Sequence, residues 1–112
     1  MAVVNQYKFF GVTSTAAETA TMLSPLISET IIIKSLHVTN QSASNTPTIT
    51  IINNAFQVIN TQTLATAASV EILTNPMVVE GNTILQYTTA GTMTDGVVIT
   101  ISYLNIKKEV TT

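Results

Sequence analysis

The side chains able to carry acid–base, nucleophilic or metal chemistry are few, and they are scattered along the chain. The 112 residues include no cysteine and a single histidine, His37. A disulfide framework, a thiolate metal site, a cysteine nucleophile and a histidine pair acting as acid and base are therefore excluded. Five of the six acidic residues are isolated in the sequence, and no run typical of a calcium loop occurs: Glu18, Glu29, Glu71, Glu80 and Asp95.

His37 and the isolated acids each admit a functional and a structural interpretation. His37 is either a pH-responsive contact or single metal ligand, or a surface or interface imidazole bonded to a neighbouring threonine. We favour the second, because no other ligand lies nearby in the sequence. Two carboxylates from distant segments can form a glycosidase pair, but solvated surface acids are the expectation. Since no G-x-S-x-G motif or phosphate loop occurs either, we predict no enzymatic activity, metal or cofactor.

Charge is sparse enough to limit the kinds of partner. Charged residues make up 9% of the chain, against about 25% in an average soluble domain. Four lysines and a pI near 5.1 do not make a nucleic-acid footprint. No apolar run approaches the roughly 18 residues of a membrane span, and the first eight residues lack the features of a signal peptide. We therefore expect synthesis inside the cell, and neither nucleic acid nor membrane as a partner.

The same sparse charge predicts a surface that partners cover. A folded monomer of this size exposes on the order of 6,000 Å². Ten charges on that area leave about one per 600 Å², against roughly one per 200 Å² for average composition. Threonine, serine and asparagine keep such a surface wet but repel copies of the chain poorly. A monomer that is merely weakly charged is the alternative, and we favour the covered surface.

The elements that position these residues are predicted to be strands. Valine, isoleucine and threonine make up 45 of the 112 residues, and such residues fit a pleated sheet. In the run 30–40, Leu36 and Val38 alternate with polar residues, while the start of the run, 31–33, is apolar on both faces and predicts cover on both sides. Ile49 and Ile51 also alternate. About seven short strands with frequent turn signals predict an all-β fold, an antiparallel β-sandwich of jelly-roll-like type.

Three connections carry specific expectations. Asn53-Asn54 predicts a tight turn, because asparagine tolerates positive φ. Asp95-Gly96 predicts a hairpin turn before the last strand, 97–106. The stretch 14–22 holds four threonine or serine residues and is expected to be irregular or extended rather than helical. The end of the chain, 107–112, is expected to be polar and exposed.

The N-terminal segment is the one feature with a positive functional interpretation. We divide the chain into residues 1–28, an extended arm or first strand, and residues 29–112, the β-sandwich. Within the arm, apolar side chains cluster around a single charge, Lys8, and strand addition to a neighbour's sheet edge is one use of such a segment. A first strand of its own sandwich is the equal alternative. The predicted partner-contact residues are Val3, Val4, Tyr7, Phe9 and Phe10.

Residues 30–106 also resemble a pattern found in small structural proteins of tailed-phage virions. In that pattern a strand "I-x-K-S-L/I-x-V-x-N", here Ile32 to Asn40, runs into a polar loop. A "T-I-T-I"-like strand follows, here Thr48 to Ile51, and then an apolar strand with an acidic-Gly-Asn turn, here Met77 to Asn82. The closing strand corresponds to Val97 to Leu104.

The resemblance implies a β-sandwich virion component, either a capsid cement or decoration protein or a neck or tail part. We expect a cement protein made in the host cytoplasm and located in the virion, with the major capsid protein or another virion protein as partner, and a homo-oligomer, a trimer by preference. A glycan-binding, adhesin-like module is the alternative from another class. Convergence of polar and aromatic residues in one concave site would favour that alternative. We further expect that residues 1–12 can be deleted without loss of the fold.

Overall fold

The computed structural model describes residues 3–108. Residues 1, 2 and 109–112, the start of the expected arm and most of the expected polar end, lie outside the described part. The described residues form nine strands and no helix: β1 (Val3–Ser14), β2 (Glu18–Leu23), β3 (Glu29–Asn40), β4 (Thr48–Asn53), β5 (Phe56–Thr63), β6 (Ala68–Glu71), β7 (Met77–Val79), β8 (Leu85–Ala90) and β9 (Val97–Lys108).

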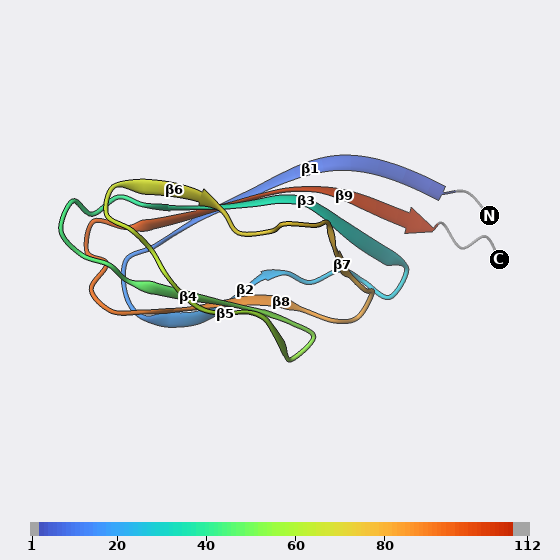
Figure 1. Cartoon of the computed structure of the whole chain (residues 1–112). Coiled ribbons are helices and arrows are strands. Elements are labelled where there is room, and N and C mark those ends of the chain that lie inside the picture. The colour runs from blue at the N-terminus through green and yellow to red at the C-terminus, as the bar shows by residue number, and fades with distance from the viewer. Residues whose placement is uncertain (1–2, 109–112) are drawn as a thin grey trace.

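The strands form two antiparallel sheets packed face to face (Figure 1). The five-stranded sheet has the order β1-β9-β3-β6, with β7 also paired to β3, and the four-stranded sheet has the order β2-β8-β4-β5. Apart from the β4–β5 hairpin and the break between β6 and β7, every connection crosses from one sheet to the other. This order is that of a jelly roll, so the predicted all-β antiparallel sandwich is confirmed.

Alternating apolar residues of both sheets fill the space between them. Leu36, Val38, Ile49 and Ile51 are all fully buried, as their alternation with polar residues predicts. Tyr87 of β8 also faces this core. Every buried side-chain nitrogen or oxygen of the described residues has a hydrogen-bond partner, so the core carries no unpaired polar atom.

The two sheets differ in length, and this gives the molecule its shape. β1, β3 and β9 have 12 residues each, whereas β2, β4 and β8 have 6. The molecule measures 56 × 22 × 22 Å and its radius of gyration is 15.1 Å, against about 13 Å for a compact domain of this size. β1 and β9 extend past the four-stranded sheet toward the chain termini (Figure 1). We call residues 3–9 of β1 and 102–108 of β9 the overhang.

The N-terminal segment supplies β1 to the five-stranded sheet and β2 to the four-stranded sheet. β1 pairs with β9 in unbroken register from Val3 opposite Lys108 to Ser14 opposite Val97. Phe10 and Val12 pack against the core from this strand. Deleting residues 1–12 would remove these contacts and the ladder to β9, so the structure leads us to expect that this deletion destabilises the fold, in place of the expectation that the fold survives it.

The connections bear out one turn prediction and correct another. Asn54 and Ala55 both have positive φ, 51° and 67°, and join Asn53 to Phe56 in a two-residue hairpin turn. Gly96 also has positive φ, but the predicted hairpin there is wrong. β8 lies between β2 and β4, and β9 lies between β1 and β3, so neither strand has a free edge with which to pair the other.

Gly81 provides a test of how the loops at the end nearest the termini are packed. A β-carbon added there would lie 2.7 Å from three backbone oxygens, those of Leu26, Ile27 and Glu29. We expect Gly81→Ala to lower the free energy of unfolding by about 2 kcal/mol or more, because the three backbone oxygens can move away from the new β-carbon only by distorting the loops. Gly11→Ala is the control, since its β-carbon meets only ordinary contacts at 3.4 Å and beyond. The measurement is chemical denaturation of both variants. Equal stabilities would contradict this packing.

Candidate functional site

The residues able to do chemistry do not gather into one site. Among residues 3–108, no group of three or more histidine, aspartate or glutamate side chains could hold a metal ion. Glu18 lies in β2, Glu29 begins β3, Glu71 ends β6, and Glu80 and Asp95 lie in loops on either side of β8. The described part of the chain also contains no helix that is long and apolar enough to cross a membrane.

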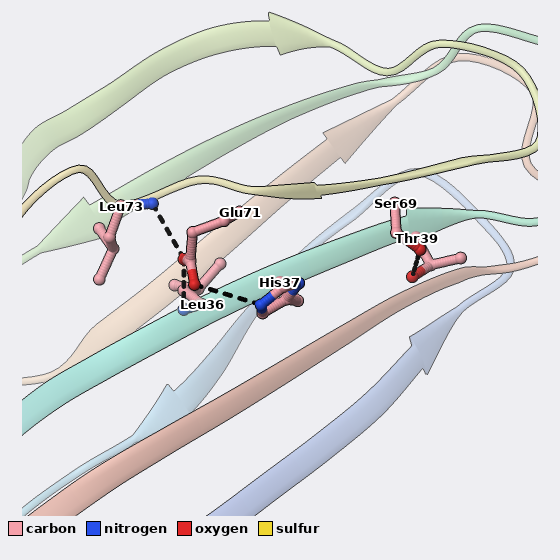
Figure 2. Close-up of polar contacts among 6 residues, drawn as sticks. All are labelled: Leu36, His37, Thr39, Ser69, Glu71 and Leu73. Carbon is pink, nitrogen blue, oxygen red and sulfur yellow. Dashed lines mark hydrogen bonds and ion pairs between the residues drawn. The ribbon is translucent and has the colours of Figure 1, made fainter.

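His37 bonds Glu71 rather than a threonine, which corrects the sequence interpretation. The two residues face each other across β3 and β6, and His37 Nε2 lies 3.3 Å from Glu71 Oε1 (Figure 2). Glu71 Oε2 also accepts the backbone N–H groups of Leu36 at 2.7 Å and Leu73 at 3.2 Å. The β6 ladder stops at Glu71, so its carboxylate satisfies amides that the ladder no longer reaches. We therefore assign the contacts between Glu71, His37 and these two amides a structural role.

A second polar cluster joins the end of β1 to the four-stranded sheet. Glu18 Oε1 accepts hydrogen bonds from the Tyr87 hydroxyl at 2.7 Å and the Ser14 hydroxyl at 2.9 Å. These two bonds hold the pKa of Glu18 below its usual value. Burial, and then the bond to Glu18, raises the pKa of Tyr87. Ser14 Oγ also lies 3.2 Å from Thr89 Oγ1. Because Ser14 of β1 bonds residues of β2 and β8, this cluster links the two sheets.

The surface shows a different organisation, because its large apolar side chains all lie at one end. Nine large hydrophobic residues are exposed in the described part of the chain, and each lies in the overhang, in β7 or near the connections β2–β3, β4–β5 and β7–β8: Val4, Tyr7, Phe9, Leu26, Ile27, Phe56, Val58, Val78 and Ile84. The chain termini lie at the same end (Figure 1). We call it the apolar end. Exposed apolar side chains that gather in one region mark interaction sites.

The outer face of the five-stranded sheet carries one row of apolar side chains across four strands. Tyr7 of β1 is opposite Leu104 of β9, which is opposite Ile32 of β3, which is opposite Val78 of β7. Directly opposite residues project from the same face of a sheet. Tyr7 is 79% exposed and Val78 50%. Ile32, expected to be covered on its outer side, is thus only partly covered within this chain.

The loops of the apolar end form two cavities. One, of about 600 Å³, is lined by the β2–β3 and β7–β8 loops, among them Leu26, Ile27 and Ile84. Ile27 is the most exposed large apolar residue described, at 84%. The other, of about 330 Å³, lies beside the β4–β5 turn and brings Phe56 together with Asn53, Asn54, Val58, Val78, Glu80 and Thr83.

The opposite end of the molecule is small and polar. Its connections, residues 15–17, 41–47, 64–67 and 91–96, expose none of the large hydrophobic residues. The lysines instead lie toward the apolar end, since Lys8, Lys107 and Lys108 are in the overhang. Lys34 shares a cavity of about 470 Å³ with Tyr7 and Phe9. The apolar end is therefore also the lysine-rich end.

The predicted contact residues lie in one strand but not on one face. Tyr7 and Phe9 are strongly exposed on the outer face, whereas Phe10 turns inward against the core. Val4 is partly exposed on the inner face, beside Lys8, and Val3 begins β1. Sequence reasoning missed the loop residues, above all Ile27. The signal was present as an apolar Leu-Ile pair between a proline and a serine, in a segment too short for a strand.

The comparisons with known proteins show the fold. No protein-family model and no curated protein matches the chain. One similar solved structure is a chain from Bacillus endospore appendages, which form disulfide-linked pili; it is 17% identical, with a TM-score of 0.53, over 96% of this chain and 89% of that one.

Another similar structure is a chain of the virus-like particle of the extra small virus of the giant freshwater prawn Macrobrachium rosenbergii. It is 12% identical, with a TM-score of 0.51, over 98% of this chain and 82% of that one. Both matches span nearly the whole jelly roll. The present chain has no cysteine, so it cannot supply a disulfide of the kind that links the pili.

The hydrogen bonds of Glu71 predict that its removal costs more stability than removal of its partner His37. Glu71→Ala leaves the Leu36 amide without its acceptor, and we expect a loss of about 1–2 kcal/mol in the free energy of unfolding. His37→Ala removes only a partly exposed ion pair and should cost less than about 1 kcal/mol. Urea denaturation of both variants measures the difference. Equal losses would show that the ion pair, rather than the amide bonds, is the stabilising contact.

Proposed function

We propose that the protein is a non-enzymatic structural component of a tailed-phage virion, a capsid cement or decoration protein that docks on the major capsid protein through its apolar end. The observation that carries this proposal is the segregation of all nine exposed large hydrophobic residues to that end. Burial of such surface across a junction between shell subunits gains roughly 25 cal/mol per Å² before the costs of docking. Many copies on one lattice make modest affinity at each site sufficient.

The charge distribution adds the chemistry of the partner. The four lysines lie around the apolar end together with two acids, Glu29 and Glu80, whereas Glu18 and Asp95 lie at the other end, so lysines outnumber acids at the apolar end of the described chain. The complementary surface is therefore apolar and bordered by carboxylates. The similar solved structures support the role in general terms, since one comes from disulfide-linked pili and the other from a virus-like particle.

Substitution of Ile27 tests this docking directly. Its side chain is 84% exposed, so Ile27→Lys should change the free energy of unfolding by less than about 0.5 kcal/mol. In the docked state the lysine would be buried against an apolar surface, and we expect occupancy on the shell to fall at least about tenfold. The measurement is co-sedimentation of the purified chain with empty shells of the phage that encodes it.

Thr94→Lys is the matched control, because Thr94 is exposed at the polar end and the substitution adds the same charge. It should bind shells like the unaltered chain. Equal binding by Ile27→Lys and the control would contradict docking through the apolar end. Binding of the unaltered chain to purified tails but not to shells would identify a neck or tail component instead.

A glycan-binding module is the second candidate, and one observation favours it. The cavity beside the β4–β5 turn brings the exposed ring of Phe56 together with the polar side chains of Asn53, Asn54 and Glu80. Carbohydrate sites commonly pair an aromatic face with amide and carboxylate groups. The jelly roll also occurs in lectins.

An array of bacterial surface glycans tests the second candidate. If the cavity binds sugar, Phe56→Ala should abolish a signal that Tyr7→Ala leaves unchanged, since Tyr7 lies on the other sheet. Absence of any glycan signal from the unaltered chain at high concentration would exclude this function for the cavity. That result would leave the docking proposal unaffected.

A further inference from the structure

The four sheet edges of this molecule are not alike. β6 and β7, which share one edge, have 4 and 3 residues. β2 has 6 residues with a register shift between Thr21 and Leu23. β5 pairs with β4 through two register shifts and has a residue of positive φ, Thr61. Shortness and bulges of this kind prevent strands of other molecules from pairing with an edge.

The β1 edge has none of these protections. It is 12 residues long, contains no proline, and keeps continuous register with β9 throughout. Lys8 is its one charged residue. In an edge strand, alternate residues direct their N–H and C=O groups away from the sheet. β1 therefore presents a row of unpaired backbone groups over about 40 Å.

The side chains of β1 are arranged nearly symmetrically about its centre. A mainly apolar stretch, residues 7–12, is flanked by Asn5-Gln6 on one side and Thr13-Ser14 on the other. When such a strand pairs antiparallel with a copy of itself near its centre, the two phenylalanines of each copy gather at the middle of the seam and most of the polar residues lie toward its ends. We propose that β1 pairs antiparallel with β1 of a second copy, joining the two five-stranded sheets into one continuous sheet across a two-fold axis.

The register follows from Lys8 and Gly11. Opposite residues must face the same side of the sheet, so the two-fold axis passes through a residue of β1 and not between two. An axis at Lys8 would set like charges directly opposite each other. An axis at Phe10 separates the two Lys8 side chains by about 14 Å along the seam, beyond the Debye length of about 8 Å.

An axis at Phe10 also sets Phe9 of each copy opposite Gly11 of the other. Gly11 has no side chain, so it leaves room for an aromatic ring at the seam. Within one chain the Phe9 ring already lies over this glycine, with its Cε2 atom 3.4 Å from the position a β-carbon would take. Gln6 then faces Ser14, and the paired segment runs from Gln6 to Ser14 in both copies.

The mass in solution tests the pairing. Size-exclusion chromatography with light scattering should give about twice the 12.0 kDa of one chain. Phe9→Lys places a new charge at the seam and should raise the dissociation constant of the dimer at least about tenfold. Phe56→Lys is the matched control, because the two rings are 69% and 70% exposed and only Phe9 lies on β1. It should leave the dimer intact.

A monomer at every concentration, or a dimer that both variants leave unchanged, would overturn the proposal. A trimer, which the sequence analysis favoured, would overturn it too, because an isologous contact closes at two copies. Ile27→Lys should not alter the mass. Failure of the dimer and failure of shell docking are thus separate results.

Cross-linking fixes the register independently of these masses, and the chain has no native cysteine to interfere. Phe9→Cys and Gly11→Cys are made as separate proteins, mixed and oxidised. We expect a disulfide-linked dimer mainly in the mixture, since each position faces the other across the seam but lies too far from its own copy to bridge. Cross-links of equal yield in each variant alone would contradict an axis at Phe10.

Discussion

The difference in length between the two sheets is the constraint on which the rest of this structure depends. A sheet face is apolar where another sheet covers it and must meet water or a partner where none does. Where the sheets overlap, the long strands carry buried residues such as Leu36, Val38 and Ile99. Past the end of the four-stranded sheet, the inner face of the overhang turns polar, with Gln6, Lys8, Glu29 and Lys107 lining an open hollow. The outer face there keeps its apolar row. The overhang thus has the composition of an interface on one side and of a solvated surface on the other.

The fold was predictable from the sequence because its information is local. Alternation places Leu36 and Val38 correctly, and the predicted turn at Asn53-Asn54 is found one residue further along the chain, at Asn54 and Ala55. What failed was pairing. Asp95-Gly96 has the chemistry of a hairpin turn, but a turn residue fixes only its own φ, and the partners of β8 and β9 are set by the whole strand order. The same limit applies to the surface. Tyr7 and Phe9 were found as an apolar cluster in one segment, whereas the apolar end gathers residues from five separate connections and strands. No periodicity in the sequence joins Ile27 to Phe56.

Two acidic residues of this chain stabilise the fold. Glu71 satisfies backbone amides at the break in an edge strand, and Glu18 joins a β1 residue to a β8 tyrosine. Each acid thereby compensates for a place where the jelly roll interrupts its own ladder or crosses between sheets. The surface is characterised by where apolar groups remain uncovered, and that uncovered area lies at the apolar end.

The β3–β4 loop shows what the polar end contributes. Its shape is held from within, because the Asn40 side chain donates to the Asn45 carbonyl at 2.8 Å and Ser42 Oγ accepts the Asn45 amide at 2.8 Å. Ala43 sits exposed at the tip of this loop. Since the chain lacks cysteine, a thiol introduced at Ala43 would be its single attachment point for a fluorophore or gold cluster. A label there sits on a rigid support far from the apolar end, so it would report which way the molecule stands on whatever surface it decorates.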